Sequence, residues 1–289
     1  MKIAGFTIIR NAVLNDYPIV EAIASVLPVV DLMIVAVGES EDDTLQLIEG
    51  IPSDKIRIVK TTWDPKAKKG GEVLAIETDK AFQHVPEEYD WAFYIQGDEV
   101  VHEQYHTTIR KAAERFKDDK KVEGLLFNYL HFYGTYDYVG DSRRWYHKEV
   151  RIIRNDKTIR SYKDAQGFRR DGQKLNVKQI DAFIYHYGWV KSPQQMQAKK
   201  RHIIRYWSEQ QQEAEKLQEQ DFFDFNDFDS LERFTGTHPN VMLPRIASRN
   251  WQVDLDVSRK RFSLKGRILY WFEKKTGIRL FDFRNYRSI

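Results

Sequence analysis

Residues 89–103 read YDWAFYIQGDEVVHE. The first part of this segment, residues 91–95, is an unbroken apolar run, which is typical of a strand covered on both faces. The run stops at a Gln-Gly-Asp-Glu sequence, residues 96–99, so two adjacent carboxylates directly follow a buried strand. Ligands of parallel α/β sheets bind outside the carboxyl ends of the strands. The segment therefore predicts a core strand that ends in a functional site.

The chain before this segment alternates between strand and helix patterns. Four segments read as strands: residues 3–9, 32–37, 55–60 and 91–95, of which the first, second and fourth are apolar runs typical of buried strands. A helical pattern follows each of the first three segments, starting near Asp16, Ser40 and Gly71. Such repeats with short connections predict an α/β fold with a mostly parallel, Rossmann-like sheet flanked by helices.

The pattern changes after residue 104. The later segments with a clear pattern are a helix near 109–116, strands near 122–134, 149–156 and 182–190, and a polar helix from Pro193 to about Gln220. A polar stretch, residues 157–178, separates the last two of these strands. We therefore divide the chain into a catalytic α/β domain, residues 1–190, and a helical C-terminal extension, residues 191–289.

Composition limits the classes of protein that fit. The 289 residues are 42% hydrophobic, which is enough for a sizeable core. The chain has no cysteine, so thiolate metal sites, thiol nucleophiles and disulfides are excluded. No apolar run approaches the roughly 20 residues that span a bilayer, and the N-terminal apolar run reads as a strand rather than a signal peptide. We expect a soluble, cytoplasmic protein.

The net charge of +3 conceals an asymmetry between the body and the tail. Residues 251–289 hold 10 Lys and Arg against 4 Asp and Glu, whereas the preceding 250 residues have a balance of −3. A mildly acidic body argues against a nucleic-acid-binding protein.

Polar clusters follow all four predicted strands of the first half. They are Arg10-Asn11, Gly38-Glu39-Ser40, the loop 61–71, and Gln96 to Glu99. Each cluster alone fits a turn or a helix cap, but parallel strands bring all of them to one edge of the sheet. A carboxylate fixed at a strand tip can bind a hard divalent cation, which also accepts substrate phosphates. Gly97 allows a ligand to approach the backbone closely.

These motifs and their order resemble the family-2-type glycosyltransferases of the GT-A fold. The match covers roughly Lys2 to Val190 and includes VGESEDDT, residues 37–44, after the second strand. The metal-binding Asp-x-Asp of the family falls on the sequence QGDE, where Gln96 replaces the first Asp. Gln keeps a carbonyl oxygen but removes one formal charge.

The resemblance implies a role for each matching residue. Glu39 would bind the uracil or ribose of a nucleotide-sugar donor, with Arg10 and Asn11 beside it. Gln96 and Asp98 would contact the donor, and Asp98 would hold Mn²⁺ or Mg²⁺ against its diphosphate. A late histidine that completes the metal site in relatives matches His186, for which a buried core histidine is the alternative.

The resemblance also implies an inverting transfer, which needs a carboxylate to deprotonate the acceptor hydroxyl. Asp164, in SYKDAQGFRR, matches best. Asp141 and Glu149 are the other candidates for this base, and Asp171 is a weaker one. Alternatively, Asp164 lies in an ordinary surface loop and has no catalytic role.

The implied activity is a metal-dependent transfer of a sugar, expected to be UDP-linked, to a glycan or a lipid-linked acceptor. A sugar nucleotidyltransferase is one alternative, although IIRNAVLNDYP, residues 8–18, lacks the glycine-rich phosphate loop that such enzymes carry. A non-catalytic nucleotide-sugar-binding module is a second alternative, because Gln96 replaces the first Asp of the metal-binding motif.

The tail contains SLKGRILYWFEKKTGIRLF, residues 263–281. Its helical pattern places Leu264, Ile268, Leu269, Trp271 and Phe272 on one side and basic residues around the other. We expect the apolar side to pack on the catalytic domain or on a second subunit. Peripheral contact with an anionic membrane is the alternative, which would suit a lipid-linked acceptor.

Overall fold

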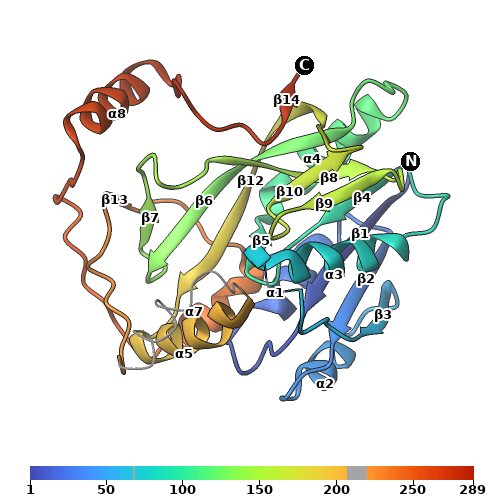
Figure 1. The fold of residues 1–289 in the computed structure, drawn as a ribbon, viewed down its shortest axis with the longest axis horizontal. Helices are drawn as coiled ribbons and strands as arrows, with labels where there is room; N and C mark the ends of the chain where they lie inside the picture. Colours follow the sequence, from blue (N-terminus) through green and yellow to red (C-terminus); the bar gives the residue numbers. More distant parts are fainter. Residues whose placement is uncertain (68, 207–219) are drawn as a thin grey trace.

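The computed structural model describes residues 1–67, 69–206 and 220–289 (Figure 1). Neighbouring strands of the main sheet follow the order β13-β7-β6-β8-β4-β1-β2-β3. Their bounds are Leu231–Arg233 (β13), Tyr138–Gly140 (β7), Gly124–Gly134 (β6), Lys148–Arg154 (β8), Trp91–Tyr94 (β4), Ile3–Ile9 (β1), Leu32–Gly38 (β2) and Ile56–Thr61 (β3).

The parallel part of this sheet, β3-β2-β1-β4, consists of the four segments predicted as strands in the first half of the chain. β1 pairs in parallel with β2 on one side and with β4 on the other, and β2 pairs in parallel with β3. Each strand begins and ends within one residue of its predicted bounds. Because these strands run in one direction, the polar residues that follow them meet at one edge of the sheet.

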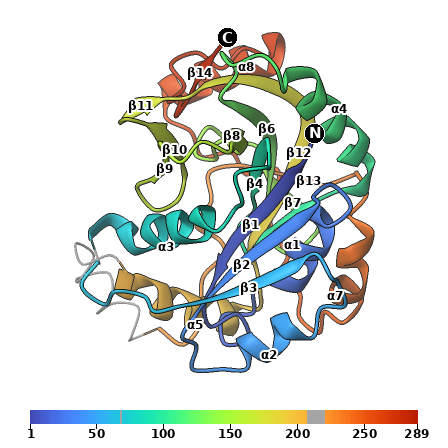
Figure 2. The same cartoon turned by 90° about the vertical axis from the view of Figure 1, so that its right-hand side faces the viewer.

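Helices cover both faces of the parallel strands (Figure 2). Ile3 and Ile9 of β1 belong to the core cluster under α1 (Ile19–Val26) and α4 (His106–Phe116). Phe6, which points to the opposite face, belongs to the cluster under α3 (Glu72–Gln83). Burial of alternate residues on two faces explains why β1 is apolar throughout. The predicted α/β fold with a largely parallel sheet flanked by helices is confirmed.

The helix after β2 begins later than predicted. α2 spans Thr44–Glu49, and Asp43, rather than Ser40, occupies the position before its first residue. The Ser40 hydroxyl donates to the Gly38 carbonyl and accepts from the backbone N–H of Asn11. Ser40 therefore joins two loops instead of capping a helix.

The sheet continues beyond β4 with reversed strands. β8 lies antiparallel between β4 and β6, so the parallel part stops at β4. β12 (Asn176–Val190) pairs in parallel with β6 and antiparallel with the short strand β5 (Glu99–Val101). The polar stretch 157–178 holds most of a small separate sheet, made of β9 (Ile159–Tyr162), β10 (Gly167–Arg170) and β11 (Gln173–Lys174).

Residues after 190 contribute both helices and strands. α5 (Pro193–Ile203) starts with a capping box in which Ser192 and Gln195 bond each other's backbone N–H, and a 3-10 turn, η3 (Ile204–Tyr206), follows it. The predicted continuation of this helix from 207 to 219 lies outside the described residues. β13 pairs with β7, and β14 (Arg287–Ser288) pairs with β12. The proposed division at residue 190 stays a prediction.

Short helical segments complete the described chain: η1 (Lys69–Gly71), η2 (Glu103–Tyr105), η5 (Asn240–Met242) and α7 (Leu243–Ala247). α8 (Leu264–Thr276) lies at the periphery, at the upper left of Figure 1. Within the part of the chain that the structure describes, no helix is long and apolar enough to cross a membrane.

Candidate active site

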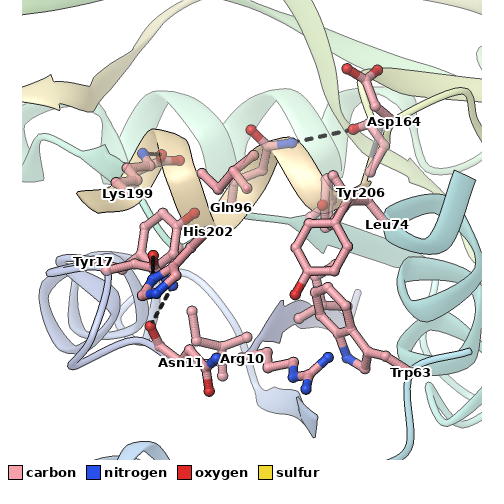
Figure 3. Close-up of a pocket in the computed structure, with 18 residues that line it drawn as sticks. Arg10, Asn11, Tyr17, Trp63, Leu74, Gln96, Asp164, Lys199, His202 and Tyr206 are labelled. Atoms are coloured by element: carbon pink, nitrogen blue, oxygen red, sulfur yellow. Dashed lines mark hydrogen bonds and ion pairs between the residues drawn. The ribbon is translucent and has the colours of Figure 1, made fainter. Parts of the chain in front are cut away.

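A cavity of about 200 Å³ opens at the carboxyl ends of β1 and β4 (Figure 3). Its other walls come from α5 with the turn after it, from the segment after β3, and from the turn between β9 and β10. The cavity brings together most of the residues predicted for a donor site: Arg10, Asn11, Gln96, Asp98 and Asp164. Convergence at the strand ends therefore occurs as the sequence predicts.

One end of the cavity combines a cation with two aromatic rings, seen at the lower right of Figure 3. The guanidinium of Arg10 lies 5.8 Å from the centre of the Trp63 ring, and the ring of Tyr206 lies 5.4 Å from that of Trp63. The Trp63 ring rests on Gly38, where an added Cβ atom would come within 2.3 Å of the indole nitrogen. Flat rings beside a cation can bind a planar heteroaromatic group.

Asn11 shapes the wall next to this end. Its backbone has a φ of 52°, a left-handed conformation that Asn adopts more readily than most residues. Its backbone N–H donates to the hydroxyl of Ser40 at 3.1 Å, and its side-chain oxygen accepts from the backbone N–H of Glu41 at 2.8 Å. Asn11 thus ties the loop after β1 to the loop after β2, and direct ligand binding by its side chain stays a prediction.

Glu39 does not line the cavity. Its side chain is exposed at the end of β2, where Oε1 accepts a hydrogen bond from the Thr62 hydroxyl at 3.0 Å. It directly follows Gly38, on which the Trp63 ring lies. The predicted contact with a nucleoside would therefore have to occur at the mouth of the cavity.

The Gln-Gly-Asp-Glu sequence sends its two carboxylates to different places. Glu99 points into the core with no exposed surface and accepts from Nε and Nη2 of Arg151 at 2.9 and 2.7 Å. It also accepts from the Tyr129 hydroxyl at 2.7 Å and from the backbone N–H of Gln96 at 3.1 Å. With its oxygens engaged in this way, Glu99 is a structural anchor, and Asp98 is the carboxylate that faces the cavity.

Asp98 lies between two basic side chains. Its Oδ2 is 3.1 Å from Nζ of Lys199, and its Oδ1 is 3.7 Å from Nε2 of His186. Burial alone would raise the pKa of Asp98, but Lys199 and His186, with a smaller effect from Lys191, outweigh it and lower the pKa to about 2. Asp98 is therefore ionised at neutral pH, and the structure brings the two predicted metal ligands, Asp98 and His186, together.

The hydrogen bonds of His131 define how His186 is oriented. Burial lowers the pKa of both histidines; it keeps His131 neutral, whereas the Asp98 carboxylate opposes the shift at His186. Nε2 of His131 lies 2.7 Å from the Tyr146 carbonyl, which can only accept, so the ring proton of His131 sits on Nε2. Its Nδ1 then accepts from Nδ1 of His186, 3.1 Å away. This arrangement leaves Nε2 of His186 as the ring nitrogen that faces Asp98.

Asp164 sits in the turn between β9 and β10 at the rim of the cavity, and Figure 3 shows its carboxylate directed away from the other labelled side chains. Its neighbours Lys163 and Ala165 have φ values of 56° and 61°, a costly conformation for residues other than glycine. The Ala165 carbonyl accepts from the side-chain amide of Gln96 at 3.3 Å, which holds the turn over the strand ends. Burial raises the pKa of Asp164 and brings this carboxylate closer to the range of a general base.

The three rival carboxylates lie elsewhere. Asp141 accepts from the hydroxyls of Ser230 and Tyr270 and pairs with Lys260. Glu149 is buried in the core, where burial raises its pKa to about 7, and Asp171 is exposed. None of the three is among the described residues that line this cavity or the one beside it.

A second cavity of about 370 Å³ lies beyond His186. Aromatic rings and carboxylates share its walls, among them Trp145, Tyr146, Trp189, Asp224 and Asp227. Because Asp98 lines the first cavity and His186 lines the second, the two cavities meet at this pair of side chains. Aromatic faces with nearby carboxylates suit a polyhydroxylated ligand.

Several residues of the first cavity were not predicted as site residues. Lys199, His202, Ile203 and Tyr206 all line it from α5 and the turn that follows. Their spacing of three, four and seven residues marks one face of a helix, and this spacing is the signal in the sequence that could have identified them. From the sequence, this segment is predicted only as part of a polar helix, and no site residue is predicted in it.

Comparisons with protein-family models and with curated proteins find no match. Among solved structures, the chain is similar to S. aureus TarS, with 16% identity, a TM-score of 0.40, and coverage of 70% of this chain and 39% of TarS. A structure of TarS residues 1–349 with UDP-GlcNAc gives the same identity and TM-score, with 70% and 65% coverage. The chain thus spans less than two thirds of the TarS chains that it matches.

Two further solved structures illustrate the range of similarity. Glucosyl-3-phosphoglycerate synthase from Mycobacterium tuberculosis, in complex with Mn²⁺, UDP and phosphoglyceric acid, has 17% identity, a TM-score of 0.31, and coverage of 45% of this chain and 43% of that chain. A 4-diphosphocytidyl-2C-methyl-D-erythritol synthase from Anaerococcus prevotii has 12% identity, a TM-score of 0.39, and coverage of 73% and 96%. Values this low assign neither a family nor an activity.

Proposed function

We propose that the chain is a glycosyltransferase that moves a sugar from a nucleoside-diphosphate sugar, UDP-linked, to a glycan or lipid-linked acceptor. The observation that carries this proposal is the pair of cavities that meet at Asp98 and His186. The first offers an aromatic end for a nucleobase and a charged end for a diphosphate, and the second offers rings and carboxylates for an acceptor. A two-substrate transfer needs both sites side by side.

The donor fits the first cavity in one direction. Its base would lie against Trp63 and Tyr206 with Arg10 beside it, and Glu39 would reach the base or ribose from the mouth. The diphosphate would then extend toward Asp98 and Lys199 at the opposite end. This direction places the sugar next to the second cavity, where the acceptor would wait.

Asp164 is the proposed general base of an inverting transfer. The acceptor hydroxyl would attack the anomeric carbon from the face opposite the diphosphate, and its proton would pass to the Asp164 carboxylate, which has to turn into the first cavity from the position in Figure 3. The bond from the anomeric carbon to the diphosphate oxygen breaks, and the electron pair leaves with the diphosphate. The pKa of Asp164, raised by burial, supports this role because a stronger base holds the proton better.

A resident Mn²⁺ or Mg²⁺, which the family resemblance implies, does not fit the residues around Asp98. Two side chains that could bind a metal, Asp98 and His186, face each other there. The ammonium of Lys199, however, lies against the Asp98 carboxylate. Glu99 is engaged by Arg151, and Gln96 directs its amide N–H₂ to Ala165. Within the described parts of the chain, no group of three or more metal-binding side chains occurs. No step of the proposed reaction is routed through a metal.

A donor panel separates this proposal from its alternatives. Purified protein is incubated with UDP-, GDP-, CDP- and ADP-linked sugars, and binding by thermal shift and release of the nucleoside diphosphate by chromatography are measured. Turnover of one donor supports a glycosyltransferase, and the anomeric configuration of the product by NMR tests inversion. Binding without turnover, even with carbohydrate acceptors, indicates a binding module. Release of pyrophosphate from a nucleoside triphosphate and a sugar 1-phosphate indicates a nucleotidyltransferase.

We also propose that α8 docks on an anionic lipid surface. Of the five apolar side chains predicted to pack, Leu264, Ile268 and Trp271 form one stripe and are 78%, 59% and 60% exposed, whereas Leu269 and Phe272 are half-buried. The predicted packing therefore does not occur for the three residues of the stripe. α8 contacts the body through polar side chains instead, with Tyr270 donating to Asp141. Exposed basic residues flank the stripe, including Lys265. Self-association through the same stripe is the other outcome that the membrane test can give.

A further inference from the structure

Lys199 occupies the place beside Asp98 where a metal would be expected. The side chain is 9% exposed, and its Nζ lies 3.1 Å from Asp98 Oδ2 and 2.9 Å from the Gly188 carbonyl oxygen. The ammonium also lies 4.6 Å from the centre of the Tyr17 ring. These contacts fix a cation at the charged end of the first cavity, opposite the aromatic end, as Figure 3 shows.

A second buried lysine, Lys191, lies behind it. The Lys191 ammonium is 5.6 Å from the Tyr17 ring, donates to the Asp16 carbonyl and lies 3.8 Å from the Asp16 carboxylate. Its side chain is 1% exposed, so the Lys191 ammonium is shielded from solvent. Burial, together with the nearby charge of Lys199, lowers the pKa of Lys191 to about 7, so near neutral pH Lys191 adds only part of a positive charge to this end of the cavity.

The hydrogen-bonding capacity of Lys199 is not exhausted by the contacts described. An ammonium has three N–H donors, and the described contacts account for two, those to Asp98 and Gly188. Lysine is a common ligand of phosphate groups because it presents a compact positive charge. A divalent ion at Asp98 would instead have to displace this ammonium, which it would also repel.

We propose that Lys199 binds the donor's diphosphate in place of a divalent metal, so donor binding and transfer need no metal ion. This inference rests on the proposed function. When the bond between the anomeric carbon and the diphosphate oxygen breaks, the leaving diphosphate gains one negative charge. The Lys199 ammonium, held by Asp98, offsets that charge without giving up its proton. The acceptor proton goes to Asp164.

The test compares nucleotide binding with and without metal. The full chain is titrated with UDP and with uridine by isothermal titration calorimetry, in EDTA, in Mg²⁺ and in Mn²⁺. We expect UDP to bind equally well, within about twofold, under all three conditions. Lys199→Met should weaken UDP binding by about 10- to 100-fold and leave uridine binding unchanged, because only UDP carries the phosphates. Lys199→Arg should retain part of the affinity.

Two controls keep this test decisive. Lys111→Met removes an exposed lysine on α4 and should change nothing. The double variant Asp98→Asn with Lys199→Met removes both charges together, so a weakened UDP affinity in a protein of normal thermal stability cannot come from an unpaired buried carboxylate. UDP binding that disappears in EDTA, or that survives Lys199→Met, overturns the inference and leaves the proposed function standing. If UDP, GDP, CDP and ADP fail to bind under every condition, the proposed function itself is wrong.

Discussion

Arg151 donates two hydrogen bonds to Glu99, from Nε at 2.9 Å and from Nη2 at 2.7 Å, and the two side chains are 1% and 0% exposed. The pair crosses from β8 to the first residue of β5. Arg151 also donates to the Gln166 carbonyl, in the turn that carries Asp164. One buried ion pair therefore connects the end of the Gln-Gly-Asp-Glu sequence to the proposed base.

Removing one charge of this pair should destabilise the fold strongly. Glu99→Gln leaves the Arg151 guanidinium buried without a counterion, for which losses of about 3–5 kcal/mol are typical. The free energy of unfolding, measured by urea denaturation, should fall by that amount. Glu41→Gln is the matched control, because Glu41 is 60% exposed and 3.7 Å from Arg10; it should cost less than about 1 kcal/mol. Equal losses in the two variants would contradict the assignment.

Glu149 should make the protein less stable as the pH rises. Its folded-state pKa is about 7, raised by burial from an ordinary value of 4.5. The folded state therefore holds the proton more tightly than the unfolded state, so stability falls between about pH 4.5 and pH 7 and stays low above that range. The free energy of unfolding of Glu149→Gln should exceed that of the wild type by about 3 kcal/mol at pH 8, and the two should be equal at pH 4. Parallel pH profiles of the two proteins by urea denaturation would refute this assignment.

The proposed base can be tested by Asp164→Asn. Turnover should fall by about 10²–10⁴-fold, the usual contribution of general-base catalysis, while UDP affinity stays unchanged. Initial rates of donor turnover and calorimetric affinities give the two readouts. Asp171→Asn, in an exposed turn nearby, should behave as the wild type. A near-normal rate in Asp164→Asn would move the role to a carboxylate of the second cavity, Asp224 or Asp227.

The second cavity should affect the acceptor and not the donor. Trp189→Ala removes one aromatic wall and should lower transfer to a carbohydrate acceptor by about tenfold, a typical value for one lost ring contact. Hydrolysis of the donor in water and UDP affinity should stay the same. Trp271→Ala on α8 removes an exposed tryptophan outside both cavities and is the control. A loss of UDP affinity in Trp189→Ala would mean that the cavity belongs to the donor.

The tail can be tested by flotation with vesicles of phosphatidylglycerol and phosphatidylcholine. At low salt the full chain should float with anionic vesicles, and binding should fade as salt screens the basic residues. Changing Leu264, Ile268 and Trp271 to Ser should abolish it. Changing Val13, Leu14 and Leu243 to Ser should leave vesicle binding intact. These three side chains are 51%, 43% and 49% exposed and lie outside α8. A dimer by analytical ultracentrifugation that ignores vesicles would assign the stripe to self-association.

The parallel strands could be predicted from the sequence because burial on two faces requires an apolar residue at nearly every position of the strand. β1 and β4 are apolar at consecutive positions, and this requirement does not depend on which helices cover them. Their polar ends then had to meet at one edge, which placed Arg10 and Asp98 in one cavity. The antiparallel insertion of β8 was not predictable, because strand order depends on pairings between distant segments.

Side-chain partners could be predicted less well than strand ends. Asp98 and Glu99 are adjacent carboxylates, and only the three-dimensional positions of Arg151 and Lys199 determine that one is a core anchor and the other faces a ligand. Lys199 lies 101 residues from Asp98 in the sequence, so no local pattern connects them. The amide of Asn11 was expected to face a ligand, yet it bonds the backbone of a neighbouring loop.

The position of Trp63 gives the protein an optical probe of its own. Its indole stands at the aromatic end of the first cavity, between Arg10 and Tyr206, where a bound nucleobase would stack against it or displace its neighbours. Tryptophan emission responds to such changes, so titration with an unlabelled nucleotide should alter the intrinsic fluorescence. The chain has seven tryptophans, and the difference between the wild type and Trp63→Phe isolates the signal of this one. Candidate ligands can therefore be screened by intrinsic tryptophan fluorescence, without a labelled substrate.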